Sequence, residues 1–196
     1  MKDMIEKILN ESLQVKEKSV RKNIKGLILL AEQIAGAFTG DRKLMLCGNG
    51  GSAADAQHIA AEFVNRFELE RPPLPAIALT TDTSVITSVG NDYSFDDIFA
   101  KQVKALGGEG DVLMAISTSG NSTNVIRAAE AAREQGIYVC GITGGDGGGL
   151  KDASDSCLIV ESASTARIQE THILMGHIVC LLVDYLLFQQ GAGEGG

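Results

Sequence analysis

The stretch Lys43-Leu44-Met45-Leu46-Cys47-Gly48-Asn49-Gly50-Gly51-Ser52 joins a short apolar, strand-like run to a helix-like pattern over 52–66. A second junction of this kind, Ile116-Ser117-Thr118-Ser119-Gly120-Asn121-Ser122, precedes a helical pattern over 122–135. A helix start offers unpaired N–H groups and a positive dipole end, and glycine lets the backbone approach a ligand closely. The hydroxyls add donors, so the two loops predict a phosphate site. Ordinary helix capping by Ser and Asn is the alternative.

Outward from these loops, the chain keeps alternating apolar strands with helices. Further strands are expected over 75–80, 111–117, 137–143 and 156–160, and further helices over 84–89, 95–106 and 166–189. Apolar strands separated by helices indicate a parallel sheet covered on both faces. We therefore predict an α/β fold: a doubly wound, three-layer αβα sandwich with five parallel strands, flavodoxin-like or Rossmann-like. Ligands of such sheets bind beyond the carboxyl ends of the strands, where both loops fall.

A long amphipathic helix is expected before the first strand, from Asp3 to about Phe38. Its apolar side needs cover, either from its own domain or from a helical subunit interface. With 196 residues and no convincing linker or repeat, the chain is predicted to be a single domain, 1–196, with an N-terminal helical extension over 1–40. The cluster Gly147-Gly148-Gly149 is expected to form a tight turn rather than a site.

The composition limits the kinds of binding partner and the cellular compartment that we expect for this protein. Seventeen basic and 25 acidic residues give a net charge of −8, which opposes a broad nucleic-acid or acidic-membrane surface. The four cysteines, which lack C-x-x-C spacing, are expected to be small buried hydrophobes of a reducing compartment: Cys47, Cys140, Cys157 and Cys180. The start of the chain lacks a signal-peptide pattern, and the apolar run 178–188 is too short for a membrane span. We expect a soluble cytoplasmic protein.

The three histidines are candidates for chemistry. His58 and Glu62 stand one helical turn apart, as half of a metal site, an oriented acid/base pair or a surface pair. His172 and His177 share the last helix with Gln169. Because Gln169 and His177 are about 80° and about 12 Å apart on that helix, spacing does not choose between the two histidines, and metal ligands from two subunits remain possible. The polar turn at Asn91-Asp92 is either part of the site or a helix cap.

Several of these stretches together resemble a known family. They are Gly48-Asn49-Gly50-Gly51-Ser52, Val89-Gly90-Asn91-Asp92, Gly110-Asp111-Val112-Leu113, the serine-rich loop 116–122, and Arg167-Ile168-Gln169-Glu170 with the downstream histidine. The chain is similar over nearly its whole length to the sedoheptulose-7-phosphate isomerases, or phosphoheptose isomerases, of the sugar-isomerase (SIS) domain superfamily. The resemblance implies conversion of D-sedoheptulose 7-phosphate to D-glycero-D-manno-heptose 7-phosphate, in heptose biosynthesis for lipopolysaccharide or related surface glycans. It also implies a cytoplasmic homotetramer with one zinc ion per subunit.

The resemblance also assigns roles to residues of this sequence. Glu62 and His177 would be the catalytic pair, so the family pattern selects His177 over His172. The zinc ligands would be His58, Glu62, Gln169 and His177. Phosphate would be held by Ser117, Thr118, Ser119 and Ser122, and the sugar by Asn49, Gly50, Gly51, Ser52, Glu62, Asn91, Asp92 and Gln169.

These residue types suit the reaction. Interconverting a ketose and an aldose moves a proton between C1 and C2 through an enediol, for which Glu62 is a sensible base. Histidine is the residue type suited to proton exchange near neutral pH, so His177 can shuttle an oxygen-bound proton. Zinc would polarise the carbonyl. A zinc-bound carboxylate is a weaker base, so Glu62 either alternates between its two roles or the metal serves assembly.

Two other functions compete. A non-catalytic SIS-domain protein that binds the bacterial replication initiator is similar to this chain around 53–58, 65–68 with 71–72, 75–79 and 101–107. That protein lacks the acid and the histidine corresponding to Glu62 and His177, so their presence favours the enzyme. A sugar-phosphate-sensing regulator would carry a helix-turn-helix domain, for which this chain has neither the room nor the positive charge.

Overall fold

The computed structural model describes residues 1–189. Five strands form one parallel sheet in the order β2-β1-β3-β4-β5. They are β1 (Leu44–Gly48), β2 (Ala76–Ala78), β3 (Val112–Ser117), β4 (Tyr138–Gly144) and β5 (Ser156–Val160). Gly48 pairs with Ile116, and Ser117 pairs with Thr143, so the carboxyl ends of β1, β3 and β4 lie side by side. This arrangement confirms the predicted sheet and places both loops at one edge.

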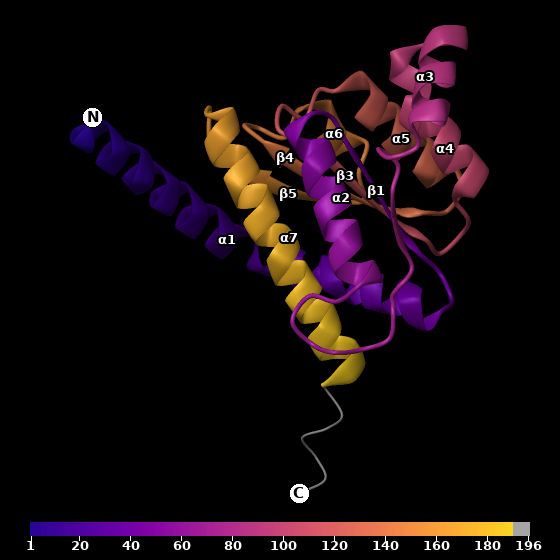
Figure 1. Cartoon of the computed structure of the whole chain (residues 1–196), viewed down its shortest axis with the longest axis horizontal. Helices are drawn as coiled ribbons and strands as arrows, with labels where there is room; N and C mark the ends of the chain where they lie inside the picture. Colours follow the sequence, from indigo (N-terminus) through magenta and orange to yellow (C-terminus); the bar gives the residue numbers. More distant parts are fainter. Residues whose placement is uncertain (190–196) are drawn as a thin grey trace, which may run out of the picture.

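Helices cover both faces of the sheet (Figure 1). One face packs against α1 (Lys2–Thr39), α2 (Gly51–Val64) and α7 (Thr165–Phe188), and the other against α4 (Ile98–Leu106) and α5 (Thr123–Glu134). The remaining helices are α3 (Thr83–Asp92), the 3-10 turn η1 (Phe95–Asp97) and α6 (Gly148–Asp152).

Alternation along the strands builds the two cores. Leu44 and Leu46 belong to the core under α1, α2 and α7, whereas Met45 and Cys47 belong to the core under α4 and α5. Successive side chains of a strand point to opposite faces. Because both faces of β1 are buried, the strand reads as a continuous apolar run. All four cysteines are free thiols; Cys47, Cys140 and Cys180 are buried, and Cys157 is half-buried.

The predicted N-terminal helix is present as α1. Its second half is buried through Leu27, Leu30 and Ile34, whereas its first half projects from the rest of the domain (Figure 1). Met4, Ile5, Leu9 and Leu13 are more than half exposed there. The helix therefore fills the core at one end and carries an uncovered apolar surface at the other.

The last helix is longer than the apolar run considered from the sequence. Among residues 1–189, α7 is the one helix whose length and composition would suffice to cross a membrane. The expectation of a segment too short to span therefore does not hold for the whole helix. Its apolar character has a different explanation, since α7 packs against α1 and α2 and contributes Met175, Val179 and Val183 to the core.

The glycine cluster after β4 forms the predicted turn, with φ values of +104° at Gly147 and +55° at Gly148, and then begins the short helix α6. Gly120 of the serine-rich loop lies directly against the Gly147 backbone, where a Cβ atom would not fit. The third glycine cluster therefore supports the serine-rich loop from behind.

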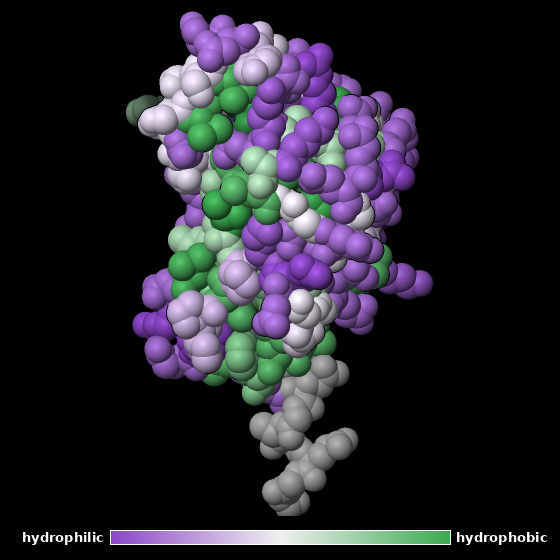
Figure 2. Space-filling model, turned by 90° about the vertical axis from the view of Figure 1, so that its right-hand side faces the viewer, coloured by the Kyte–Doolittle hydropathy of each residue, from purple (hydrophilic) through white to green (hydrophobic). Residues whose placement is uncertain are grey.

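The face seen at the right of Figure 1 carries separate apolar patches among hydrophilic residues (Figure 2).

The edge strand β2 is short, and its Ile77 is 38 % exposed. The predicted strand over 75–80 is too long, although the Pro75 carbonyl still accepts a hydrogen bond from the Leu44 N–H and the Leu79 N–H donates to the Leu46 carbonyl.

Candidate active site

The loop after β1 is tied to the start of α5. Asn49 and Asn124 exchange two side-chain hydrogen bonds of 2.8 and 2.9 Å. Gly50 has a φ of +54°, which glycine adopts without strain, and α2 begins at the next residue. Ser52 is buried, whereas Gly50 and Gly51 are exposed. The structure thus joins the two predicted phosphate-binding loops.

Hydroxyl groups gather at the start of α5. The Ser117 hydroxyl lies 3.1 Å from that of Ser122 and 3.4 Å from that of Ser119, and Ser119 Oγ also accepts a hydrogen bond from the Asn121 N–H. Ser122 is the N-cap residue but makes no side-chain capping bond. Thr118 is half-buried and Ser119 is exposed. These hydroxyls and the free N–H groups of the first helical turn together suit an anion.

Three predicted site residues meet between α2 and α7. The Nε2 atoms of His58 and His177 are 2.9 Å apart, and a carboxylate oxygen of Glu62 lies 3.4 Å from His58 Nε2. Phe67, in the loop after α2, stacks on the His177 ring with centroids 5.2 Å apart. The His58 side chain is 48 % exposed and that of Glu62 is 20 % exposed. A carboxylate, an imidazole pair and a solvent opening thus come together at this contact.

Gln169 lies eight residues before His177 on α7, or just over two helical turns away from that contact. Its amide packs directly on Gly51, where a Cβ atom would not fit, and it hydrogen-bonds to Asp55. The described residues therefore do not bring Gln169 and His177 to one point. That agrees with their separation along α7 and leaves Gln169 as a zinc ligand a prediction.

Asp55 is a site residue that the sequence reasoning missed. Burial raises the pKa of its carboxyl, while the hydrogen bond from Gln169 and the nearby His58 oppose the shift. Its Oδ2 atom is buried without a hydrogen-bond partner. Its spacing of three residues before His58 and seven before Glu62 places it on the same face of α2 and could have identified it.

His172 is a core residue. Its Nε2 lies 2.9 Å from the Thr143 carbonyl oxygen, and burial lowers the pKa of the imidazole to about 4. It is therefore neutral near pH 7. The structure places His177, and not His172, in contact with His58, the partner of Glu62.

Asn91 and Asp92 lie in the last turn of α3, where the Asn91 amide donates to the Asp92 carboxylate at 2.8 Å. Both are exposed, and α3 packs against η1 and α4. The structure brings Asn91 and Asp92 together with each other, but not with the serine-rich loop or His58. Their sugar-binding role therefore stays a prediction.

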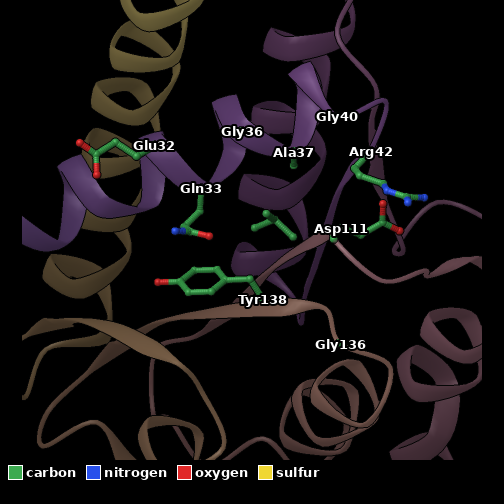
Figure 3. A pocket seen from close by; sticks show the side chains of 11 residues that line it. Glu32, Gln33, Gly36, Ala37, Gly40, Arg42, Asp111, Gly136 and Tyr138 are labelled. Atoms are coloured by element: carbon green, nitrogen blue, oxygen red, sulfur yellow. The ribbon is translucent and has the colours of Figure 1, made fainter.

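A cavity of about 490 Å³ lies at the opposite, amino end of the strands (Figure 3). Arg42, Asp111 and Tyr138 line it, below the last turns of α1. Asp111 already accepts hydrogen bonds from the ammonium and N–H groups of Lys43. Lacking the histidines and the serine loop, this cavity is not the candidate site.

The donor set between α2 and α7 suits zinc. Two imidazole nitrogens and a carboxylate are ligand types that zinc prefers, and His58, Glu62 and His177 supply them within 3.4 Å of the central His58 nitrogen. Within residues 1–189, however, no three His, Cys, Asp or Glu side chains are already arranged around a metal position. A bound ion would replace the direct contact between the two histidines.

Comparison with known proteins identifies the family. Residues 8–144 match the family model of the SIS domain. The phosphoheptose isomerase of Nitratidesulfovibrio vulgaris strain Hildenborough is 55 % identical over 179 residues, covering 91 % of this chain and 86 % of the relative. That of Clostridium acetobutylicum is 51 % identical over 196 residues, covering 99 % and 100 %. The structure of the phosphoheptose isomerase from Neisseria gonorrhoeae superposes with a TM-score of 0.87 at 45 % identity, covering 93 % of this chain and 98 % of that one.

Proposed function

This chain belongs to the SIS-domain family of phosphoheptose isomerases, and from that membership we propose that the contact between α2 and α7 is where it isomerises sedoheptulose 7-phosphate. The product is D-glycero-D-manno-heptose 7-phosphate, a precursor for surface glycans. The observation that carries the assignment of the site is the meeting of His58, Glu62 and His177. The comparisons give no support to the replication-initiator alternative.

The substrate is proposed to bind with its phosphate at the start of α5, on Ser117, Thr118, Ser119 and Ser122. The sugar chain then runs along the first turns of α2, past Asn49 to Ser52 and Gln169, with Asn91 and Asp92 as further sugar ligands. His58 follows Gly51 by seven residues, or about 10 Å of helix. An extended seven-carbon chain held by its phosphate can place its carbonyl end in that direction.

Proton transfer then needs one base and one shuttle. The Glu62 carboxylate removes the proton from C1 of the ketose and returns it to C2, which creates and consumes the enediol. His177 moves the oxygen-bound proton between O1 and O2, and stacking on Phe67 fixes its ring. Asp55 holds Gln169 against Gly51, so that its amide can bind a sugar hydroxyl.

Zinc is proposed to be held by His58, Glu62 and His177, with Gln169 as the fourth ligand that the family resemblance implies. When bound, the ion would polarise the carbonyl oxygen. The test of the whole proposal is to follow aldose formation from sedoheptulose 7-phosphate with and without a chelator. Absence of aldose with folded, zinc-loaded protein would contradict it.

Alanine at Ser119 and Ser122 is expected to raise KM about tenfold or more while kcat changes little, because phosphate contacts bind the ground state and the transition state alike. Steady-state kinetics with sedoheptulose 7-phosphate measures this. Thr39→Ala, which removes an exposed hydroxyl at the end of α1, is the matched control. An unaltered KM in the double variant would show that the phosphate does not bind at this loop.

A homotetramer is proposed to cover the first half of α1. Ile5, Leu9 and Leu13 recur every four residues, form one stripe and are 66, 54 and 56 % exposed. Ile5→Glu with Leu9→Glu is expected to reduce the molecular mass measured by light scattering from four chains to fewer, whereas Gln14→Glu should not. An unchanged mass in the double variant would contradict the assignment of this surface to the tetramer interface.

A cytoplasmic location is also proposed, supported by the free thiols.

A further inference from the structure

A buried ion pair lies beneath the proposed catalytic residues. Arg71, in the loop after α2, donates from Nε to an Asp184 carboxylate oxygen of α7 at 2.8 Å, and the two side chains are 1 and 5 % exposed. Charged groups at this depth are costly unless every one is paired. This pair links the end of one proposed catalytic helix to the other.

Arg71 also ends the α2 helix. Its Nη atoms donate to the carbonyl oxygens of Glu62 at 3.0 Å, Phe63 at 2.7 Å and Asn65 at 3.4 Å. The last carbonyl groups of a helix lack helical partners, and a cation stabilises the negative end of its dipole. The guanidinium therefore holds the backbone of Glu62 itself.

Asp184 occupies the matching place on α7. It follows His177 by seven residues, so both lie on the same face of the helix. Cys180 lies between them, and burial together with the charges of Glu62 and Asp184 raises the pKa of its thiol to about 12, an effect that Arg71 opposes. The face carrying His177, Cys180 and Asp184 therefore looks onto the end of α2.

The same loop contacts His177 directly. Phe67 stacks on the imidazole, four residues before Arg71 enters the core. In Figure 1 the loop leaves α2 and passes around the lower part of α7 before reaching β2. One segment thus holds the backbone of the proposed base and the ring of the proposed shuttle.

We propose that Arg71 and Asp184 are positioning residues, which set the register of α2 against α7 and thereby the placement of Glu62 relative to His177. The inference rests on the proposed roles of those two residues. Both side chains are buried, and neither belongs to the proposed substrate ligands. Their effect is therefore expected in the chemical step and not in substrate affinity.

The first test is Arg71→Lys, which keeps the charge opposite Asp184 but cannot reach all three carbonyl groups with one ammonium. We expect kcat to fall at least tenfold with KM within twofold. The kinetic isotope effect with deuterium at C1 should increase, because proton removal becomes more rate-limiting. Val103→Ala, in the core on the other face of the sheet, is the control for lost stability alone: kcat should stay within twofold.

The second variant, Arg71→Met with Asp184→Leu, replaces the pair by apolar side chains, an exchange that proteins often tolerate. The same loss of kcat at unchanged KM is expected. A kcat within twofold of wild type in either folded variant would overturn the inference. So would failure of both to fold, because the pair would then serve the stability of the whole chain. If Glu62→Gln also kept its turnover, the proposed active site itself would be wrong. If Glu62→Gln lost its turnover while the Arg71 and Asp184 variants kept theirs, only the positioning role of the ion pair would be wrong.

Discussion

Glu62→Gln is expected to lower kcat for sedoheptulose 7-phosphate on the order of 10³-fold, within the range that a positioned base contributes. The amide keeps the size and the hydrogen-bonding capacity of the side chain but cannot take a proton from carbon. Binding of the sugar phosphate, measured by calorimetry, should change little because the serine loop is intact. Glu130→Gln, which makes the same exchange at an exposed position of α5, is the matched control.

The metal content of Glu62→Gln separates its two proposed roles. A variant that keeps zinc but loses turnover assigns Glu62 to proton transfer. Loss of both zinc and turnover assigns Glu62 first to metal binding. Unchanged turnover would contradict both proposed roles.

His177→Gln is expected to lower kcat about 10²-fold, because the oxygen-bound proton loses its shuttle. Steady-state kinetics with sedoheptulose 7-phosphate measures this loss. His172→Gln is the matched comparison on the same helix. Its imidazole is buried and hydrogen-bonded to the Thr143 carbonyl, so thermal stability should fall while turnover of the folded protein is kept.

The opposite pattern, with turnover lost in His172→Gln and kept in His177→Gln, would contradict the assignment. The comparison is informative because helical spacing alone left both histidines open. Only their surroundings, a backbone carbonyl for one and His58 with Phe67 for the other, separate them.

The fold was predictable because its signals are local. Continuous apolar runs such as 44–47 and 112–116 are typical of strands buried on both faces, and the structure confirms them as β1 and β3. The predicted last helix, 166–189, differs by one residue at each end from α7. The edge strand β2 was predicted too long because only part of 75–80 pairs in a regular way with β1.

The site was predictable only in part, because its remaining contacts join distant segments. The spacing of His58 and Glu62 indicated one half, but nothing local connects Arg71 to Asp184, 113 residues away. Asp55 was missed because a lone carboxylate on an amphipathic helix is usually solvated. It is nevertheless buried here, and the Gln169 amide that meets its carboxyl comes from the distant helix α7.

The most direct measurement is a crystal structure of Glu62→Gln with sedoheptulose 7-phosphate bound. We expect the phosphate among Ser117, Ser119 and Ser122, with C1 and C2 within reach of residue 62 and His177. A sugar phosphate seated elsewhere, such as the cavity beside Arg42 and Tyr138, or one whose first two carbons point away from α7, would contradict it.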